Sequence, residues 1–289
     1  MLTQVLVRYC LILPAFKTEY FITGIFPKYL SDANFFLLVL STVLIAAGGY
    51  IINDYFDVQT DKINKPGKNI VEICISKVRA RNLYFVLSIF GVVLGFYLAL
   101  QISKPAIGFI PLFSTVSLWM YSSYYKRQLL SGNILISILS ALSILIVGLY
   151  EPEFYRNFIY LIWFTVSAFI LSVIRELIKD IEDIEGDSLT QCTTFPIVFG
   201  IYKTKIIIKS LIIVLATYVT YNLYNYFYTN SVLNYWYLIS FFLIPLSALF
   251  YLVSTANEKR DFYYASLFSK LIMFGGVCSI FLFWIYFLK

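Results

Sequence analysis

The sequence predicts an all-α membrane protein, a bundle of about nine transmembrane helices around a central cavity. Of its 289 residues, 60% are hydrophobic and only 13% are charged, and the mean hydropathy is +0.80. Soluble domains are about half apolar and a quarter charged, so this composition excludes a water-soluble globule. Residues 35–52 and 134–149 are apolar or small on every face, unlike the alternating strands of a β-barrel.

Nine apolar runs have the length of about 18 to 22 residues with which a helix crosses the hydrocarbon core. The first run carries Arg8, whose charge must face other helices or extend to the membrane surface, and it lacks the pattern of a cleaved signal peptide. Together the runs predict one membrane domain over residues 1–289. The helices are expected to begin, within about four residues, near Val5, Phe35, Leu83, Ile107, Ile134, Phe158, Leu211, Tyr235 and Leu267.

The basic residues predict the orientation of these helices. Lys and Arg gather after the second, fourth, sixth and eighth helices, and Arg8, before the first, is assigned to the same face. The opposite face carries little beyond Lys28, Lys104, Arg156 and Lys289. Because the basic loops of membrane proteins stay in the cytoplasm, the N-terminus and the even-numbered loops are expected there. The net charge of +6 is thus a topology signal and predicts no nucleic-acid partner.

Residue types that are missing narrow the chemistry. The chain has no histidine, which excludes Ser-His catalysis, His-ligated zinc, haem and non-haem iron. Its four cysteines are far apart and form no C-x-x-C pair, so neither a disulfide framework nor a thiolate metal site is predicted. A metal ion in this protein must therefore be held by oxygen ligands.

The acidic residues are concentrated in two short segments. Nine of the 16 lie in residues 53–61, directly after the second predicted helix, and in residues 176–187, after the sixth. Aspartates recur at i, i+3 and i+7 in both segments, which places each set on one stripe of a helix. The two stripes consist of Asp54, Asp57 and Asp61 and of Asp180, Asp183 and Asp187.

Either acidic run alone is typical of a solvated helix end that nearby lysines balance. Two runs with the same spacing on the same predicted face instead favour a shared site, because carboxylates on one stripe repel one another and need a cation. Mg²⁺ binds through carboxylates and substrate phosphate oxygens. The pattern therefore predicts a Mg²⁺ site that grips a diphosphate.

These motifs resemble the two signatures of the UbiA-type intramembrane prenyltransferases. Residues 53–61 match the first, N-D-x-x-D-x-x-x-D, and the second stripe matches the D-x-x-D-x-x-x-D type. Within the family, residues 175–187 look most like the geranylgeranylglyceryl phosphate geranylgeranyltransferase branch. Many members have Arg-Pro-x-Asn in the first helix, where this chain reads Arg8-Tyr9-Cys10-Leu11, so that helix supports no acceptor assignment.

The resemblance implies Mg²⁺-dependent transfer of a polyprenyl group from its diphosphate to a lipid acceptor, with geranylgeranylglyceryl phosphate as the expected acceptor. An apolar, aromatic cavity suits the allylic cation of such a reaction. The implied location is the cell (inner) membrane, among its lipids, with the active site facing the cytoplasm. The six aspartates are the expected metal ligands, and the expected substrate contacts are Asn53, Lys65, Lys126, Arg127, Arg175 and Lys179.

Two alternatives remain open at this point. Prenylation of an aromatic acceptor, as in quinone, haem or chlorophyll pathways, uses the same diphosphate site, so the aspartates do not distinguish it. A secondary transporter also carries acidic residues in its membrane domain, but those residues usually lie near the bilayer midplane. The acidic clusters here lie at helix ends, which disfavours transport.

Overall fold

The computed structural model describes the chain except residues 15, 17–23, 25–27, 65–69, 153–157, 227–235, 238 and 288–289. At residues 63–64, 158, 225–226, 282–283 and 285–287 only the backbone is described. Within the described residues the secondary structure is helical, apart from turns and one isolated bridge between Val71 and Ile75. The all-α prediction is confirmed.

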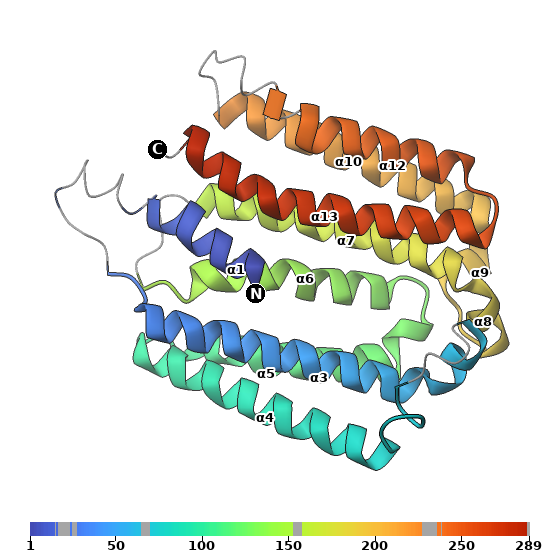
Figure 1. Cartoon of the computed structure of the whole chain (residues 1–289), viewed down its shortest axis with the longest axis horizontal. Coiled ribbons are helices and arrows are strands. Elements are labelled where there is room, and N and C mark those ends of the chain that lie inside the picture. Colours follow the sequence, from blue (N-terminus) through green and yellow to red (C-terminus); the bar gives the residue numbers. More distant parts are fainter. Residues whose placement is uncertain are drawn as a thin grey trace.

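The long helices run side by side along the long axis of the molecule (Figure 1). In chain order the elements are α1 (Leu2–Leu6), the π-helical η1 (Val7–Ile12), α3 (Asp32–Asn64), α4 (Lys77–Gln101), η2 (Pro105–Gly108), α5 (Phe109–Ser123), η3 (Tyr125–Arg127), α6 (Ser131–Leu149), α7 (Phe158–Glu182), α8 (Ile184–Leu189), α9 (Phe195–Phe199), α10 (Ile201–Tyr226), η4 (Ile239–Leu243), α12 (Ile244–Thr255) and α13 (Lys259–Phe287).

Seven helices in the described part of the chain are long and apolar enough to cross a membrane. Two shorter apolar helices, Leu2–Ile12 and Ile239–Thr255, occupy the places of the first and eighth predicted spans. The protein is thus a multi-pass membrane protein, while the number of nine spans stays a prediction.

Three helices begin more than four residues before the predicted positions. The helices α4, α10 and α13 start at Lys77, Ile201 and Lys259, where Leu83, Leu211 and Leu267 were expected. The apolar run marks only the part of a helix that meets hydrocarbon, whereas backbone hydrogen bonding continues into the polar turns beyond it.

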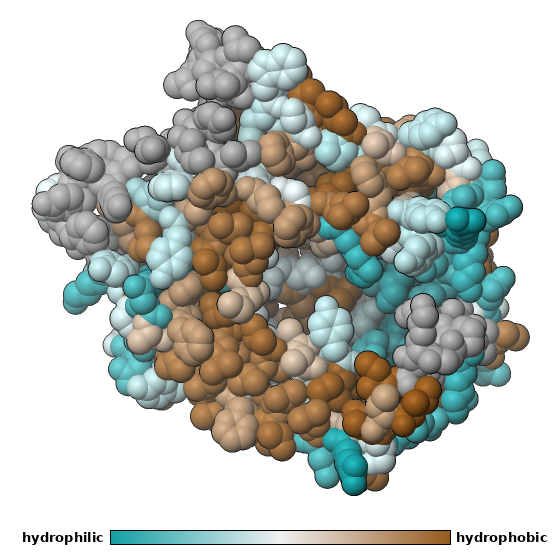
Figure 2. Space-filling model, viewed as in Figure 1, coloured by the Kyte–Doolittle hydropathy of each residue, from teal (hydrophilic) through white to brown (hydrophobic). Residues whose placement is uncertain are grey.

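The bundle is held together by close helix packing. The helix α3 packs against α4 and α5, and α7 packs against α6, α10 and α13. At Gly95 of α4 an added Cβ would lie 2.3 Å from Cγ of Pro111, so α4 approaches its neighbour closely only because that residue lacks a side chain. Figure 2 shows hydrophobic residues across the middle of one face and hydrophilic residues toward the end where Figure 1 places α8 and α9.

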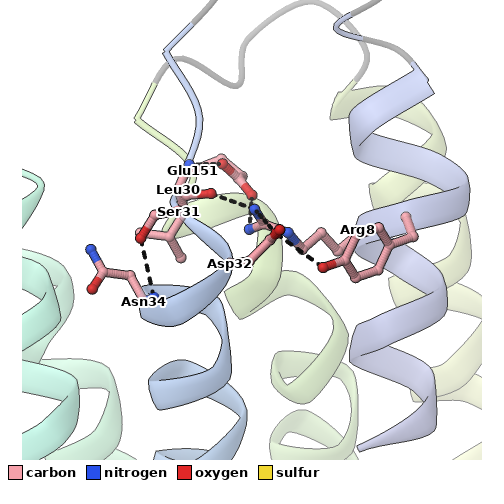
Figure 3. A network of polar contacts seen from close by, with 7 residues as sticks. Arg8, Leu30, Ser31, Asp32, Asn34 and Glu151 are labelled. Atoms are coloured by element: carbon pink, nitrogen blue, oxygen red, sulfur yellow. Dashed lines mark hydrogen bonds and ion pairs between the residues drawn. The ribbon is translucent and has the colours of Figure 1, made fainter.

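The N-terminal helix enters the bundle. Gln4 Nε2 donates hydrogen bonds to Thr42 Oγ1 on α3, at 3.1 Å, and to the Ser143 carbonyl on α6, at 3.2 Å. Further along, the fully buried Arg8 donates from Nη1 to Oε1 of the equally buried Glu151 at 2.7 Å (Figure 3). This ion pair ties η1 to the segment after α6.

The assignment of Arg8 to the same face as the aspartates is wrong. The Arg8 guanidinium also binds the Leu30 carbonyl and lies 3.4 Å from Oδ1 of Asp32, the first residue of α3. The first aspartate motif follows roughly 30 Å later along that helix, at the opposite end of the bundle. Because the charge of Arg8 is neutralised inside the protein, it is exposed on neither side of the membrane. Arg8 therefore does not indicate the orientation of the helices.

Candidate active site

The first aspartate motif lies in the last turns of α3. Asn53 and Asp57 are one turn apart, and Asn53 Nδ2 donates a hydrogen bond to Asp57 Oδ2 at 2.6 Å. Asp57 is 7% exposed, whereas Asp54 and Asp61 are half-buried. The predicted stripe therefore forms, with its middle carboxylate turned furthest into the protein.

The second motif extends over the break between α7 and α8. Asp180 is in the last turns of α7, Asp183 occupies the position before α8, and the buried Asp187 belongs to α8. Asn133 on α6 donates from Nδ2 to Asp180 Oδ2 at 2.7 Å. Because α8 packs against α3, the two motifs lie at one end of the bundle, as predicted.

Lys126 joins the two motifs. Its Nζ forms an ion pair with Asp57 Oδ2, lies 3.5 Å from Asn53 Oδ1, and interacts electrostatically with Asp187 and Asp61. Burial alone would lower the pKa of Lys126, but these carboxylates outweigh burial and raise it. The lysine is therefore held in its charged form between the segments.

The pKa of Asp187 is raised by its burial among other carboxylates. Burial, followed by the negative charge of Asp183, raises the pKa of Asp187 to about 6, against the attraction of Lys126 and Lys179. A cation bound beside Asp187 would favour its ionised form. This electrostatic environment suits a site that binds positive charge.

A cavity of about 430 Å³ begins beside the motifs and extends into the bundle. Its polar end carries Asn53 from the first motif and, from α7, Arg175, Glu176 and Lys179. Arg175 Nη1 forms an ion pair with Glu176 Oε1, and Lys179 interacts electrostatically with Glu176. The remaining lining is mostly apolar, with a few hydroxyl groups: Ser41, Thr42, Ile45, Ala46, Gly49, Tyr50, Pro111, Ser114, Leu118, Tyr121, Ile136, Leu139, Ser140, Leu142, Ser143, Ile146, Ser172 and Met273.

A second cavity of about 400 Å³ shares Ser140, Ser143 and Met273 with the first. Its other walls come from α1, α7, α10, α12, α13 and η4 and include Phe164, Leu215 and further apolar side chains. No charged residue lines it among those described. The protein thus has a polar-ended cavity and an apolar one on either side of a common wall.

One expected substrate contact, Arg127, is not among the residues that line the cavity, and another cannot be placed. Arg127 is exposed, and its backbone carbonyl accepts hydrogen bonds from the N–H and Oγ1 of Thr193, at 2.8 Å and 3.1 Å. It therefore fastens η3 to the segment after α8. Lys65 lies outside the described residues.

Sequence reasoning did not select Tyr121, Asn133 or Glu176 as site residues. Tyr121 and Asn133 belong to two short segments that resemble the family, Tyr121-Ser122 and Gly132-Asn133, but they carry no charge and were given no role at the site. Glu176 was visible as one acid of the second run, but it falls outside the i, i+3, i+7 stripe. Only the packing of α5, α6 and α7 places these three side chains next to the motifs.

The donor set fits a hard divalent cation. Both motifs offer carboxylate oxygens, the ligands that Mg²⁺ prefers, and Asp57 and Asp187 share Lys126 as a cationic neighbour. In the described part of the chain no three such side chains converge on one point that would hold an ion. The chemistry of the side chains therefore fits the metal, and in this structure lysines balance the carboxylates of Asp57 and Asp187.

Gly132 supports the position of Lys126. A Cβ added at Gly132 would lie 2.7 Å from the carbonyl oxygen of Tyr125 and 3.0 Å from Cα of Lys126, both backbone atoms that cannot turn aside. We expect Gly132→Ala to displace η3 and Lys126 with it, and therefore to lower turnover about tenfold or more, in addition to the stability loss of about 1–3 kcal/mol that overpacking typically causes. Gly275→Ala is the matched control, since no atom lies within 4 Å of its added Cβ. Equal turnover in both variants, measured by product formation, would contradict the steric argument.

Comparison with known proteins identifies similar sequences. The model of the UbiA prenyltransferase family matches residues 23–275. The digeranylgeranylglyceryl phosphate synthase of Sulfurisphaera tokodaii is 32% identical over 245 residues, which cover 83% of this chain and 84% of that protein. The synthase of the same name from Saccharolobus solfataricus is 38% identical over 188 residues, covering 65% of this chain and 64% of that protein.

Solved structures share the fold. One described as a digeranylgeranylglyceryl phosphate synthase has a TM-score of 0.66, with 23% identity over 98% of both chains. A UbiA homolog from Archaeoglobus fulgidus bound to GPP and Mg²⁺ has a TM-score of 0.62, with 16% identity over 96% of this chain and 98% of that one. At these identities the likeness extends to the fold alone.

Proposed function

This chain belongs to the UbiA prenyltransferase family, and we propose from that premise that it transfers a geranylgeranyl-like group from its diphosphate to geranylgeranylglyceryl phosphate. The observation that carries the proposal is the meeting of the two aspartate motifs around Lys126, beside a cavity that is charged at one end and mostly apolar elsewhere. The names of its relatives support this acceptor.

The site separates the two halves of a prenyl diphosphate. Mg²⁺, which would neutralise the negative charge of the diphosphate, would be held by the six aspartates of the two motifs, Asp54, Asp57, Asp61, Asp180, Asp183 and Asp187. Lys126 adds a fixed positive charge at the same end, and Asn53 offers its amide to the phosphate oxygens. The prenyl chain extends into the cavity, where Tyr50 and Tyr121 provide aromatic faces for an allylic cation and the apolar walls exclude water.

A second set of cations supports this acceptor. Lys126 pairs with Asp57 outside the cavity lining, whereas Arg175 and Lys179 line the cavity beside Glu176. The phosphate of an acceptor that enters the cavity would meet these two cations. Two cavities of similar size also suit a reaction in which both substrates carry long isoprenoid chains. A small aromatic acceptor would need neither feature.

The test offers purified protein geranylgeranyl diphosphate with either geranylgeranylglyceryl phosphate or hydroxybenzoate. We expect mass spectrometry to detect the ether product with the first acceptor and no prenylated ring with the second. Turnover should cease in excess EDTA and return with Mg²⁺, since only oxygen ligands are available. Prenylation of the aromatic acceptor alone would refute the proposed substrate, and full turnover in EDTA would refute the metal site.

We further propose that residues 1–289 act as one domain in the cell (inner) membrane, with the site facing the cytoplasm. The basic residues of the loops at the site end, including Lys126 and Lys259, support this orientation. In a cysteine-free variant, a single cysteine placed at Thr60 or at Ser188 should react with an impermeant thiol reagent only from the cytoplasmic side. Labelling of the two positions from opposite sides would contradict a shared site.

A further inference from the structure

Glu176 is an acidic residue of the second segment that the metal site does not use. It lies on α7 one turn before Asp180, is 6% exposed, and is the sole acidic side chain among the described residues that line the polar-ended cavity. Arg175 contacts its Oε1, and Tyr121 of α5 and Lys179 are electrostatic neighbours. The aspartates lie at the end of the bundle, whereas this carboxylate reaches the cavity wall.

Ether formation in that cavity requires a proton acceptor. The hydroxyl oxygen of a glyceryl acceptor gains a bond to carbon and must lose its proton when the bond forms. Asp57 is unsuited to this task because it is not among the residues that line the cavity, and its carboxylate is already bound by Lys126 and Asn53. Among the described residues Glu176 has only Arg175 as a hydrogen-bond partner, at Oε1, which leaves Oε2 for a bound hydroxyl.

We propose that Glu176 accepts the proton of the acceptor hydroxyl, an inference that rests on the proposed function. The bond between C1 of the prenyl group and the diphosphate oxygen breaks, and its electron pair leaves with the diphosphate. A lone pair of the acceptor oxygen forms the new bond to C1, and the hydroxyl proton passes to Oε2 of Glu176. Arg175 holds the carboxylate in place through Oε1.

The test compares Glu176→Gln, which keeps the shape of the side chain, with Glu185→Gln. Glu185 belongs to the same acidic run but is exposed and pairs with Lys259 at 3.2 Å. Removal of a general base typically slows turnover about 10²–10⁴-fold, and we expect a loss in that range for Glu176→Gln. Mg²⁺-dependent binding of geranylgeranyl diphosphate should stay within twofold of wild type, and Glu185→Gln should change neither quantity.

A second pair of variants separates proton transfer from packing. Glu176→Asp should recover part of the lost rate, and added formate should partly restore Glu176→Ala, because a small carboxylate can occupy the space that the side chain vacates. Full turnover in Glu176→Gln would overturn the inference, since the diphosphate or water would then take the proton. Loss of donor binding in that variant, or no rescue by Asp or formate, would overturn it too. Failure of the wild type to make any ether product would instead refute the proposed function itself.

Discussion

Replacing Asp57 or Asp187 with Asn is expected to lower prenyl transfer at least a thousandfold. These are the two buried carboxylates of the motifs, one on α3 and one on α8, and both interact with Lys126. Asn keeps the size of the side chain but removes the charge that would bind Mg²⁺ and, through it, the diphosphate. Loss of one electrostatic contact to a transition state typically costs about 10²–10³ in rate, and loss of a metal ligand weakens several such contacts together.

The double variant tests whether the motifs act as one unit. If Asp57 and Asp187 hold the same diphosphate, Asp57→Asn combined with Asp187→Asn should be scarcely slower than either single variant. Glu72→Gln is the control, because Glu72 is an exposed acid whose partners among the described residues are Lys62 and Lys77. Rate losses that multiply in the double variant would show that the motifs work separately. Wild-type turnover in a folded single variant would show that these aspartates are not needed to bind the metal or the diphosphate.

The parts of this site that were predictable from the sequence are those with local periodicity. The i, i+3, i+7 spacing places Asp54, Asp57 and Asp61 on one stripe of α3, and the shared face followed from counting spans. In the second motif the same spacing does not give one stripe, because the helix breaks at Asp183, between α7 and α8. Helix starts at Lys77, Ile201 and Lys259 were missed because hydropathy detects the apolar part of a helix and not its polar extension.

The rest depends on contacts between distant segments. Asn133 meets Asp180 only because α6 packs against α7, and Arg8 meets Glu151 across 143 positions of sequence. The sequence around Arg8 or Glu151 does not indicate that the two side chains pair. The apolar runs beside them look the same whether the charge is buried or reaches the membrane surface. The wrong placement of Arg8 follows from that ambiguity, because a charge near a helix end is normally exposed.

Breaking the Arg8 and Glu151 pair is expected to cost more stability than breaking any other of the described ion pairs. Both side chains are fully buried (Figure 3). Glu151 Oε2 also accepts the Leu30 N–H at 2.7 Å, Lys104 Nζ donates to the Glu151 carbonyl oxygen at 2.9 Å, and the guanidinium lies 4.5 Å from the Phe35 ring centroid. Burial raises the pKa of Glu151, and the Leu30 N–H and Arg8 act against that rise.

Removing one partner should therefore destabilise the protein far more than removing the pair. Arg8→Met leaves the buried Glu151 without the Arg8 charge, and Glu151→Gln leaves Arg8 with the exposed Asp32 at 3.4 Å in place of a buried partner. Removing one partner of a buried pair typically costs about 3–5 kcal/mol. The exposed Lys62 and Glu72 pair, 3.0 Å apart, is the matched control, and Glu72→Gln should cost less than about 1 kcal/mol. The free energy of unfolding is measured by denaturation in mixed micelles.

The combination Arg8→Met with Glu151→Leu decides whether the loss comes from the stranded charge. Because this double variant buries no charge, it should recover most of the stability that either single variant loses. Turnover per folded molecule should stay near that of wild type in all three variants, since the pair lies roughly 30 Å from the aspartates along α3. A double variant as unstable as Glu151→Gln would instead mean that the hydrogen bonds to Leu30, and not the charge balance, hold the N-terminal helix in the bundle.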